Sequence, residues 1–353
     1  MKKIQEKIEN QLKSQLPFVV YNKPNMKEVV GMFQNNNDVF TITNEFDTKG
    51  FVFAPFDATN KTVVIPLANS KIIKDVFVSE AFDSDGNFFS NQTSKSVHIS
   101  LVEKGIAAIK KEQFKKVVLS RKEKVILDKL AVFETYCKLL QAYPNAFVYV
   151  WFHPKVGLWF GATPETLVKL ENNNFTTMAL AGTQVYKENE HYKWHKKEID
   201  EQKFVTEYIV SKLAGFSKGL NISEAETVRA GSLLHLRTQI NGELDTLKAD
   251  SLYSLVDLLH PTPAVCGFPK APSKQFILDN ENYNRSYYTG FLGELNMGNQ
   301  NNNDSHLFVN LRCMEVVNTD VYIYVGGGIT KDSNPLKEWE ETVAKSTIMK
   351  KIL

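Results

Sequence analysis

Hydrophobic and polar positions along the N-terminal third of the chain predict a short helix, several short strands and a second helix. Residues 1 to about 14 have the spacing of a short amphipathic helix, and β-branched and aromatic runs follow at 39–43, 51–54 and 63–66. The Asp85-Gly86 pair is typical of a hairpin turn. A helical pattern then extends from about residue 96 to 113 and precedes a strand at 117–119.

The rest of the chain combines paired strands with groups of helices. A helix is predicted around 130–142, and the apolar runs 147–152 and 158–160 flank His153-Pro154-Lys155-Val156-Gly157, which indicates a hairpin. Helical patterns cover 195–214, about 223–230 and 249–259, and strands at 307–311 and 321–325 precede a closing helix. The Asn-rich stretch from Asn296 to Asp304 is expected to be an exposed loop. Adjacent hairpins and clustered helices favour an α+β fold over alternating βαβ units.

The composition limits the classes of partner. The chain has 353 residues, 43% of them hydrophobic and 23% charged, as in an ordinary globular protein, and this length fits either two domains or one large core. With 42 basic and 40 acidic residues, the net charge of +2 argues for neither nucleic acid nor an anionic membrane, whereas a small anionic substrate needs only local positive charge. Three cysteines without a metal-binding spacing, an N-terminus without an apolar leader and the lack of a bilayer-spanning stretch predict a cytoplasmic protein.

Three consecutive glycines, Gly326 to Gly328, follow the apolar run 322–325. Glycines permit positive φ and let backbone N–H groups approach an anion closely, so the segment fits a carboxylate or phosphate cradle. A flexible turn explains the same residues, and the spacing matches neither the P-loop nor the dinucleotide fingerprint.

Two pairs of glutamates have helical spacing. Asn334 or Ser333 can cap a helix with Pro335 in its first turn, and that helix presents Glu338, Glu341 and Lys345 on one face. Glu198 and Glu201 have the same three-residue spacing in the helix predicted at 195–214. Two such faces brought together would supply oxygen ligands for Mg²⁺, and an ordinary solvated helix surface is the alternative for each.

A lysine and a glutamate next to predicted strands are candidates for proton transfer. Lys116 begins an apolar strand and could act as a general base only if its pKa were lowered, and the alternative is a lysine that borders the strand. Glu165 follows the hairpin at 147–160 and could act as a general acid if its pKa were raised, and the alternative is a carboxylate at a helix N-terminus.

Two histidines and an arginine complete the set of candidates. His235 and His260 have apolar neighbours and fit buried structural histidines as well as site residues. Arg312, at the end of the strand predicted at 307–311, could hold a carboxylate through two hydrogen bonds or form a structural ion pair.

The serial order of these features resembles the chorismate-utilising enzymes, and most closely the isochorismate synthases. Matching blocks extend over about 105–350, whereas residues 1–104 match no block and are expected to be an N-terminal scaffold of the same domain. The blocks are 116–121, 161–165, 180–183, Glu201, 235–238, 259–265, 285–290, 311–312, 326–329 and 338–342 with Lys345.

The resemblance implies one α+β domain, 1–353, with two large, mainly antiparallel sheets packed face to face, helices outside and the site in a cleft between them. It implies that Glu201 and Glu341 bind Mg²⁺, with Glu198 and Glu338 supporting them. Chorismate would be held by its carboxylates and pyruvyl group. The implied substrate contacts are Gly182, Thr183, His235, Tyr288, Arg312, Gly326, Gly328 and Lys345.

The implied reaction is the conversion of chorismate to isochorismate. Lys116, as a neutral amine, would remove a proton from water that attacks ring carbon C2, and Glu165 would protonate the departing C4 hydroxyl. The acid and the base would need pKa values shifted in opposite senses. The metal would position the substrate and neutralise carboxylate charge.

Individual residues favour one branch of the family. Amine-transferring relatives typically carry glutamine at the position of Lys116, and aminodeoxychorismate synthases usually carry lysine at the position of Ala181. Both residues therefore favour water as the nucleophile. Salicylate synthases, which also eliminate pyruvate, share the acid, the base and the ligands and stay open, as does the pathway, menaquinone or siderophore synthesis. We expect a monomer without a glutamine amidotransferase subunit.

Three positions depart from the family pattern: Gln202 stands where histidine is usual, and Ser286 and Cys266 stand where glycine is usual. None of them removes a charged catalytic group. A catalytically silent binding subunit is the remaining alternative, and the presence of Lys116 and Glu165 together with both metal-binding glutamates argues against it.

Overall fold

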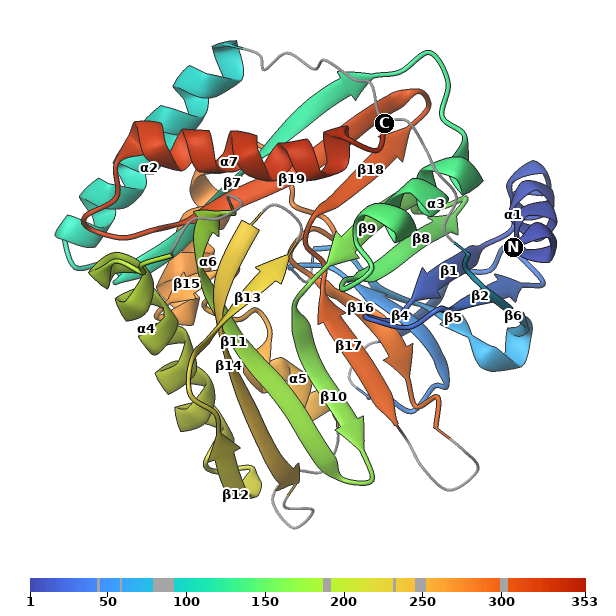
Figure 1. Cartoon of the computed structure of the whole chain (residues 1–353), viewed down its shortest axis with the longest axis horizontal. Helices are drawn as coiled ribbons and strands as arrows, with labels where there is room; N and C mark the ends of the chain where they lie inside the picture. The colour runs from blue at the N-terminus through green and yellow to red at the C-terminus, as the bar shows by residue number, and fades with distance from the viewer. Residues whose placement is uncertain are drawn as a thin grey trace.

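Two large antiparallel sheets form the framework of the molecule, and helices cover their outer faces (Figure 1). The structure is a computed structural model that describes residues 1–42, 45–57, 59–78, 92–186, 192–230, 233–244, 252–298 and 304–353. Every strand pair in it is antiparallel. The fold is therefore α+β with two packed antiparallel sheets, as the resemblance implied.

Within the described ranges, the first sheet has nine strands, and its order does not follow the chain. From edge to edge the strands are β15 (Gly267–Phe268), β7 (Lys116–Ile126), β19 (Asp320–Ile329), β18 (Cys313–Val317), β9 (Gly157–Thr163), β8 (Phe147–His153), β1 (Phe18–Asn22), β2 (Glu28–Gln34) and β6 (Ser70–Val76). Strands from the last part of the sequence thus lie between β7 and β9.

The second sheet has ten strands in the part of the chain that the structure describes, and it is interleaved in the same way. Its order is β12 (Ser217–Ile222), β14 (Leu233–Leu244), β11 (Asn174–Val185), β10 (Thr166–Glu171), β17 (Ser305–Val309), β16 (Phe291–Leu295), β4 (Gly50–Ala54), β5 (Thr62–Pro66) and β3 (Phe40–Ile42), and β13 (Glu226–Ala230) also pairs with β14. Here β16 and β17 join the N-terminal strands to β10.

Aromatic side chains fill the space between the two sheets. Phe53 of β4 stacks on Tyr287 at 4.3 Å between ring centroids, and Phe147 of β8 stacks on Phe308 of β17 at 4.2 Å. Strand β8 is buried along its whole length, which explains its unbroken apolar run, because helix α3 covers its other face.

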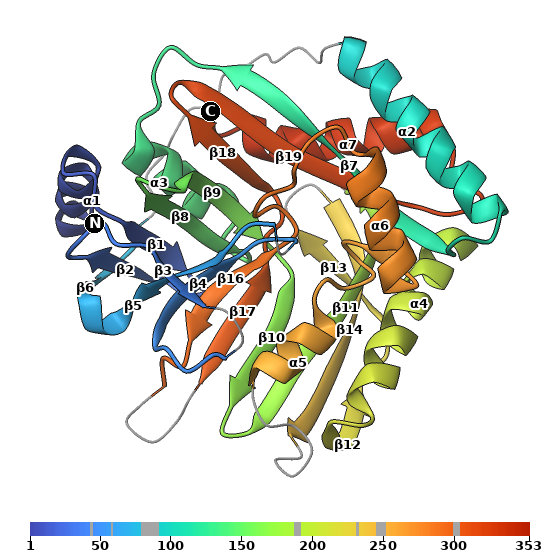
Figure 2. The same cartoon turned by 180° about the vertical axis from the view of Figure 1, so that it is seen from behind.

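The helices lie on the outside and vary in length. They are α1 (Lys2–Lys13), α2 (Gln92–Lys110), α3 (Val132–Ala142), α4 (Lys196–Leu213), α5 (Leu252–Leu259), α6 (Lys270–Asn280) and α7 (Pro335–Lys350), with a 3₁₀ turn at Leu67–Asn69. Helices α2 and α7 contact each other and β19, α4 packs on β11, and α6 packs on β7 (Figures 1 and 2). Within the described residues, no helix is both long and apolar enough to cross a bilayer.

Most of the predicted elements are present, with one change of type. The hairpin at 147–160 is confirmed as β8 and β9, with Trp151 opposite Trp159. The helix predicted near 223–230 is wrong, because residues 226–230 form β13 and pair with β14. The predicted turn at Asp85-Gly86 lies outside the described residues. The Asn-rich stretch lies between Leu295, which ends β16, and Ser305, which begins β17. The predicted exposure is not seen in its described part, because Asn296 is buried and residues 297, 298 and 304 are half-buried. Residues 299–303 lie outside the described residues.

Candidate active site

All of the predicted site residues except Lys116, Glu338 and His260 line one cavity of about 110 Å³, and the His260 ring instead contacts the Thr289 carbonyl at 3.0 Å. At roughly 10–15 Å³ per water, this volume holds on the order of eight water molecules and suits a small ligand. The lining residues from the predicted set are Glu165, Gly182, Thr183, Glu198, Glu201, His235, Tyr288, Arg312, Gly326, Gly328, Glu341 and Lys345. Residues far apart in the sequence therefore meet at one place.

Both sheets and two helices contribute to this cavity. The first sheet supplies β19, and the second sheet supplies β11 and β14 with Thr183 and His235. Helix α4 brings Glu198 and Glu201, and α7 brings Glu341 and Lys345. Helix α7 begins where predicted, because the Asn334 side chain accepts hydrogen bonds from the backbone N–H groups of Leu336 and Lys337.

The glycine segment is part of a strand, so the predicted turn is wrong. Gly326, Gly327 and Gly328 belong to β19 and pair with Ser120, Leu119 and Val118 of β7. Their backbone does not take up the positive φ angles that a nest would use. Glycine is required here for space: a Cβ atom on Gly328 would lie 2.6 Å from Glu201 Oε1 and 3.0 Å from Lys116 Cε.

Glu165 is a buried carboxyl group between β9 and β10. It is 3% exposed, and burial raises its pKa to about 8, although the positive charges of Lys116 and Arg312 act in the opposite direction. The chain continues into strand β10, so Glu165 is not a helix N-terminal carboxylate. At neutral pH the group is protonated and faces a cavity lined by Arg312, as a general acid requires.

Lys116 is buried behind the cavity wall. It is 1% exposed, and its Nζ lies 2.8 Å from Glu201 Oε1. Ser273 Oγ donates a hydrogen bond to the Lys116 carbonyl at 2.9 Å, which fixes the start of β7. Lys116 therefore reaches the cavity through Glu201 and does not simply border a strand.

The buried His235 and the half-buried Arg312 form a pair at one end of the cavity. Burial lowers the pKa of His235 to about 3, and the neighbouring Arg312 charge acts in the same direction, so the imidazole is neutral. Arg312 Nη2 donates to His235 Nε2 at 2.6 Å, so the proton of the neutral ring is on Nδ1, which donates to the Gly182 carbonyl at 2.9 Å. His235 thus orients the guanidinium and ties it to β11.

Three of the four glutamates, Glu201, Glu338 and Glu341, lie against the glycine segment, and the fourth, Glu198, lies against Gly182 of β11. The position of a Cβ on Gly327 would be 3.4 Å from Glu338 Oε2 and 3.5 Å from Glu341 Oε1, so carboxylate oxygens fill the space that glycine leaves. Lys345 Nζ donates to Glu341 Oε1 at 2.7 Å and to the Gly326 carbonyl at 3.0 Å. Glu198 Oε2 also accepts from the His195 N–H at the start of α4.

Oxygen donors of this kind suit a hard divalent cation such as Mg²⁺. The carboxylates stand on both sides of β19, and two of them hold lysines as counter-charges. In the described part of the chain, no three His, Cys, Asp or Glu side chains already converge as a metal site. The carboxylate oxygens are suitable ligands for this ion, and the glutamate side chains would have to move closer together to bind it.

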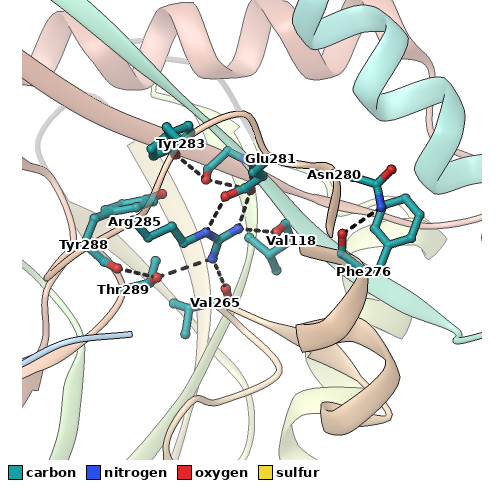
Figure 3. A network of polar contacts seen from close by, with 10 residues as sticks. Val118, Val265, Phe276, Asn280, Glu281, Tyr283, Arg285, Tyr288 and Thr289 are labelled. Carbon is teal, nitrogen blue, oxygen red and sulfur yellow. Dashed lines mark hydrogen bonds and ion pairs between the residues drawn. The ribbon is translucent and has the colours of Figure 1, made fainter. Parts of the chain in front are cut away.

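A buried ion pair supports the wall that carries Tyr288, and the sequence did not reveal it. Arg285 Nη2 and Nε donate to the Glu281 carboxylate at 2.6 and 2.7 Å, and the guanidinium also donates to the carbonyls of Val118 and Val265 (Figure 3). The same carboxylate accepts from the Ser120 backbone and hydroxyl at 2.8 Å. The pair thus joins β7 to the loop that leads to Tyr288. In the sequence, the i, i+4 spacing of Glu281 and Arg285 is the signal that could have indicated this ion pair.

The three departures from the family pattern have clear local settings. Gln202 is buried and donates to the Ala179 carbonyl at 3.0 Å and to Thr238 Oγ1 at 3.1 Å, so it joins α4 to the second sheet. Ser286 has φ of 52°, in the left-handed region where glycine is favoured. Cys266 is fully buried in an apolar cluster. None of the three lines the cavity.

Known proteins resemble this chain in sequence and in fold. The vibriobactin-specific isochorismate synthase of Vibrio cholerae is 31% identical over 202 residues, which cover 55% of this chain and 49% of that protein. The chain thus spans about half the length of the curated relatives it matches first. The isochorismate synthase MenF of Haemophilus influenzae is 24% identical over 312 residues, covering 86% of this chain and 71% of the relative.

A solved structure and a family model complete the comparison. The structure of MenF, the menaquinone-specific isochorismate synthase from Escherichia coli, covers 96% of this chain and 88% of that chain, with a TM-score of 0.80 and 20% identity, and so shares the fold. A family model described as chorismate binding enzyme matches residues 67–353. Since this match covers well over half of the sequence, the protein belongs to the chorismate binding enzyme family.

Proposed function

We propose that this protein is an isochorismate synthase, a Mg²⁺-dependent isomerase that converts chorismate to isochorismate. The observation that supports it best is Glu165, a buried carboxyl group with a pKa raised to about 8 in a cavity that also contains Arg312 and Lys345. A neutral acid beside fixed cations suits a substrate that has carboxylates and loses a hydroxyl group. The resemblance of the chain to several isochorismate synthases points the same way.

Lys116 and Glu165 would carry out the two proton transfers. Lys116, after giving up the proton that it holds in the ion pair with Glu201, takes a proton from a water molecule as the water oxygen bonds to C2 of the ring. The ring double bonds shift, the C4–O bond breaks, and Glu165 gives its proton to the departing hydroxyl, which leaves as water. One water molecule is consumed and one is released, so the reaction is a net isomerisation.

Arg312 and Lys345 would bind the carboxylates of the substrate. Arg312 is held by His235, and Lys345 is held by Glu341, so both cations are oriented before the substrate arrives. Tyr288 is buried on the cavity wall, and Gly182 and Thr183 present backbone and a hydroxyl group on the opposite sheet.

Glu201 and Glu341 would hold Mg²⁺, with Glu198 and Glu338 supporting them from the same helices. When bound, the ion neutralises the ring carboxylate and fixes the ring. Removal of Mg²⁺ should therefore abolish turnover and leave the fold intact.

Two residues favour water over ammonia as the nucleophile. Lys116 occupies the place where amine-transferring relatives typically have glutamine, and Ala181 occupies the place of the lysine usual in aminodeoxychorismate synthases. We therefore propose that the chain acts without an amidotransferase subunit, as a monomer. Its three cysteines are all free and buried, which supports a reducing, cytoplasmic location.

Product analysis of chorismate turnover tests this function. Purified protein with chorismate and Mg²⁺ should form isochorismate, and EDTA should stop the reaction until Mg²⁺ is restored. Parallel reactions with ammonium, scanned for amino products, pyruvate and salicylate, separate the amine-transferring and salicylate-forming alternatives. Absence of any turnover by protein with an unchanged circular dichroism spectrum would disprove the enzyme proposal.

A further inference from the structure

A second, larger cleft shares no lining residue with the candidate active site. It measures about 720 Å³ and lies between α2, β7, the segment that follows α6, and Tyr322 of β19. Its size is that of a pocket for a small organic molecule. Helix α6 and the residues after it are visible beside β7 in Figure 3, where Asn280 and Tyr283 are labelled.

The cleft is basic. Its lining contains His98 and Lys104 from α2 and Arg121, Lys122 and Lys124 from β7, and no aspartate or glutamate is among the described residues that line it. Lys124 pairs with Asp320 at 2.6 Å. Lys104 and Lys122 make no ion pair with any residue in the described ranges. This uneven distribution of charge favours an anionic occupant.

Arg121 leaves one donor edge unused. It is 6% exposed, its Nη1 donates to Glu123 at 2.8 Å, and its Nε donates to Thr342 Oγ1 at 2.8 Å. Nη2 is buried and has no hydrogen-bond partner in the part of the chain that is described. The guanidinium also lies 4.4 Å from the Trp339 ring of α7, so Arg121 connects the cleft to the helix that carries Glu338 and Glu341.

His98 is a second buried group with an unused ring nitrogen. It is 2% exposed, and its Nδ1 makes no hydrogen bond to any described residue. Burial lowers its pKa to about 4, so the ring is neutral and one ring nitrogen carries a proton. Buried polar groups in folded proteins are nearly always paired, and two unpaired groups at one cleft indicate that a ligand completes their hydrogen bonds.

We propose that this cleft binds an oxyanion group, carboxylate or phosphate, of a small molecule. Arg121 Nη2 and His98 Nδ1 donate to the oxyanion, and Lys104 and Lys122 supply the surrounding positive charge. Tyr283, Tyr322 and Leu101 form walls that can contact the rest of the molecule. This proposal does not depend on the proposed catalytic function, because binding in the cleft can be measured directly and without turnover.

Isothermal titration calorimetry on the full chain tests the proposal with two probes, sodium phosphate and sodium benzoate, at constant ionic strength. At least one probe should bind, and the probe that binds identifies the type of oxyanion. His98→Phe keeps a ring of similar size and removes the nitrogen, and should weaken binding about tenfold or more. The double variant Lys104→Gln with Lys122→Gln should weaken it as well, and its melting temperature checks that the fold is kept.

Two controls locate the binding event. Because Arg312 is itself proposed to hold a carboxylate, Arg312→Gln removes probe binding at the candidate active site only. The binding that His98→Phe weakens should persist unchanged in Arg312→Gln, and also in Lys71→Gln on the distant strand β6. The proposal is overturned if neither probe binds, if His98→Phe and the double lysine variant bind as tightly as the unchanged chain, or if Arg312→Gln alone removes the signal.

Discussion

Lys116 and Glu165 are the two residues whose burial most constrains the chemistry. Because each is proposed to transfer one proton, Lys116→Gln and Glu165→Gln should each lower kcat by roughly 10²–10⁴-fold. The matched controls are Lys115→Gln, an exposed neighbour on the same segment, and Glu171→Gln on β10. Rates are measured by chromatography of the product, with melting temperatures as a check on folding. Full activity in either site variant would refute its role.

The raised pKa of Glu165 predicts how both rate and stability depend on pH. An acid with a pKa of about 8 loses its proton above that pH, so kcat should fall there. In the unfolded chain the same group ionises near pH 4.5, so the unfolded state binds fewer protons between these values and stability decreases as pH rises from about 4.5 to 8.

Glu165→Gln removes this titration and should stabilise the fold by about 3 kcal/mol at pH 7, with little gain at pH 4. Urea unfolding at both pH values measures the difference. An equal effect at the two pH values would mean that Glu165 is already ionised in the folded protein.

For single residues, the sequence predicted which side chains line the candidate active site better than it predicted which residues those side chains contact. The raised pKa expected of Glu165 follows from its place among apolar residues. The Arg312–His235 contact could not be predicted, since the two residues are separated by 77 positions and meet only when β14 approaches the start of β18. The role of Gln202 was hidden for the same reason.

Strand β19 is the element whose sequence is most tightly restricted by the site. Gly328→Ala places a methyl group where Glu201 Oε1 and Lys116 Cε now lie, so the Glu201–Lys116 pair must shift. We expect a loss of activity of at least about tenfold. Gly215→Ala is the matched control, since nothing lies within 4 Å of its added methyl group. Steady-state kinetics on both variants test this expectation. Full activity of Gly328→Ala would show that the close approach of Glu201 and Lys116 to Gly328 is not needed.

Helices and strands could be predicted where buried residues recur with a simple period. They could not be predicted where the neighbouring strand determines the secondary structure. The apolar runs of β8 and β9 and the capped start of α7 were clear in the sequence. Residues 223–230 have the composition of a helix, yet Thr227 and Arg229 pair with Leu236 and Leu234 of β14. Strand preference depends on the neighbouring strand more than on intrinsic propensity, so this segment was predicted incorrectly.

For the whole molecule, the Glu281–Arg285 pair connects the first sheet to the loop that enters the second. Both side chains are 2% exposed. Glu281→Gln leaves a buried guanidinium without its counter-charge and should lower the free energy of unfolding by about 3–5 kcal/mol. Glu28→Gln breaks an exposed pair with Lys74 and should cost less than about 1 kcal/mol. Urea unfolding at pH 7 compares them, and similar losses would contradict the structural role of the buried pair.

The overall class could be predicted from hairpins and clustered helices, and the strand order could not. Antiparallel neighbours close in sequence, such as β8 and β9, leave local signals. The insertion of β19 between β7 and β18 depends on contacts across some 200 residues, for which a single sequence carries no period or turn signal. The same long-range pairing brings Lys116 next to the glycine segment.

That interleaving has a consequence for how the chain is made. A ribosome releases the N-terminal strands first, yet β7 and β9 stay apart until β18 and β19 emerge, and β10 stays separated from β4 until β16 and β17 emerge. The nascent chain therefore carries open, apolar strand edges through most of its synthesis, a state prone to aggregation. The yield of folded protein in a cell should therefore depend on chaperone protection during translation.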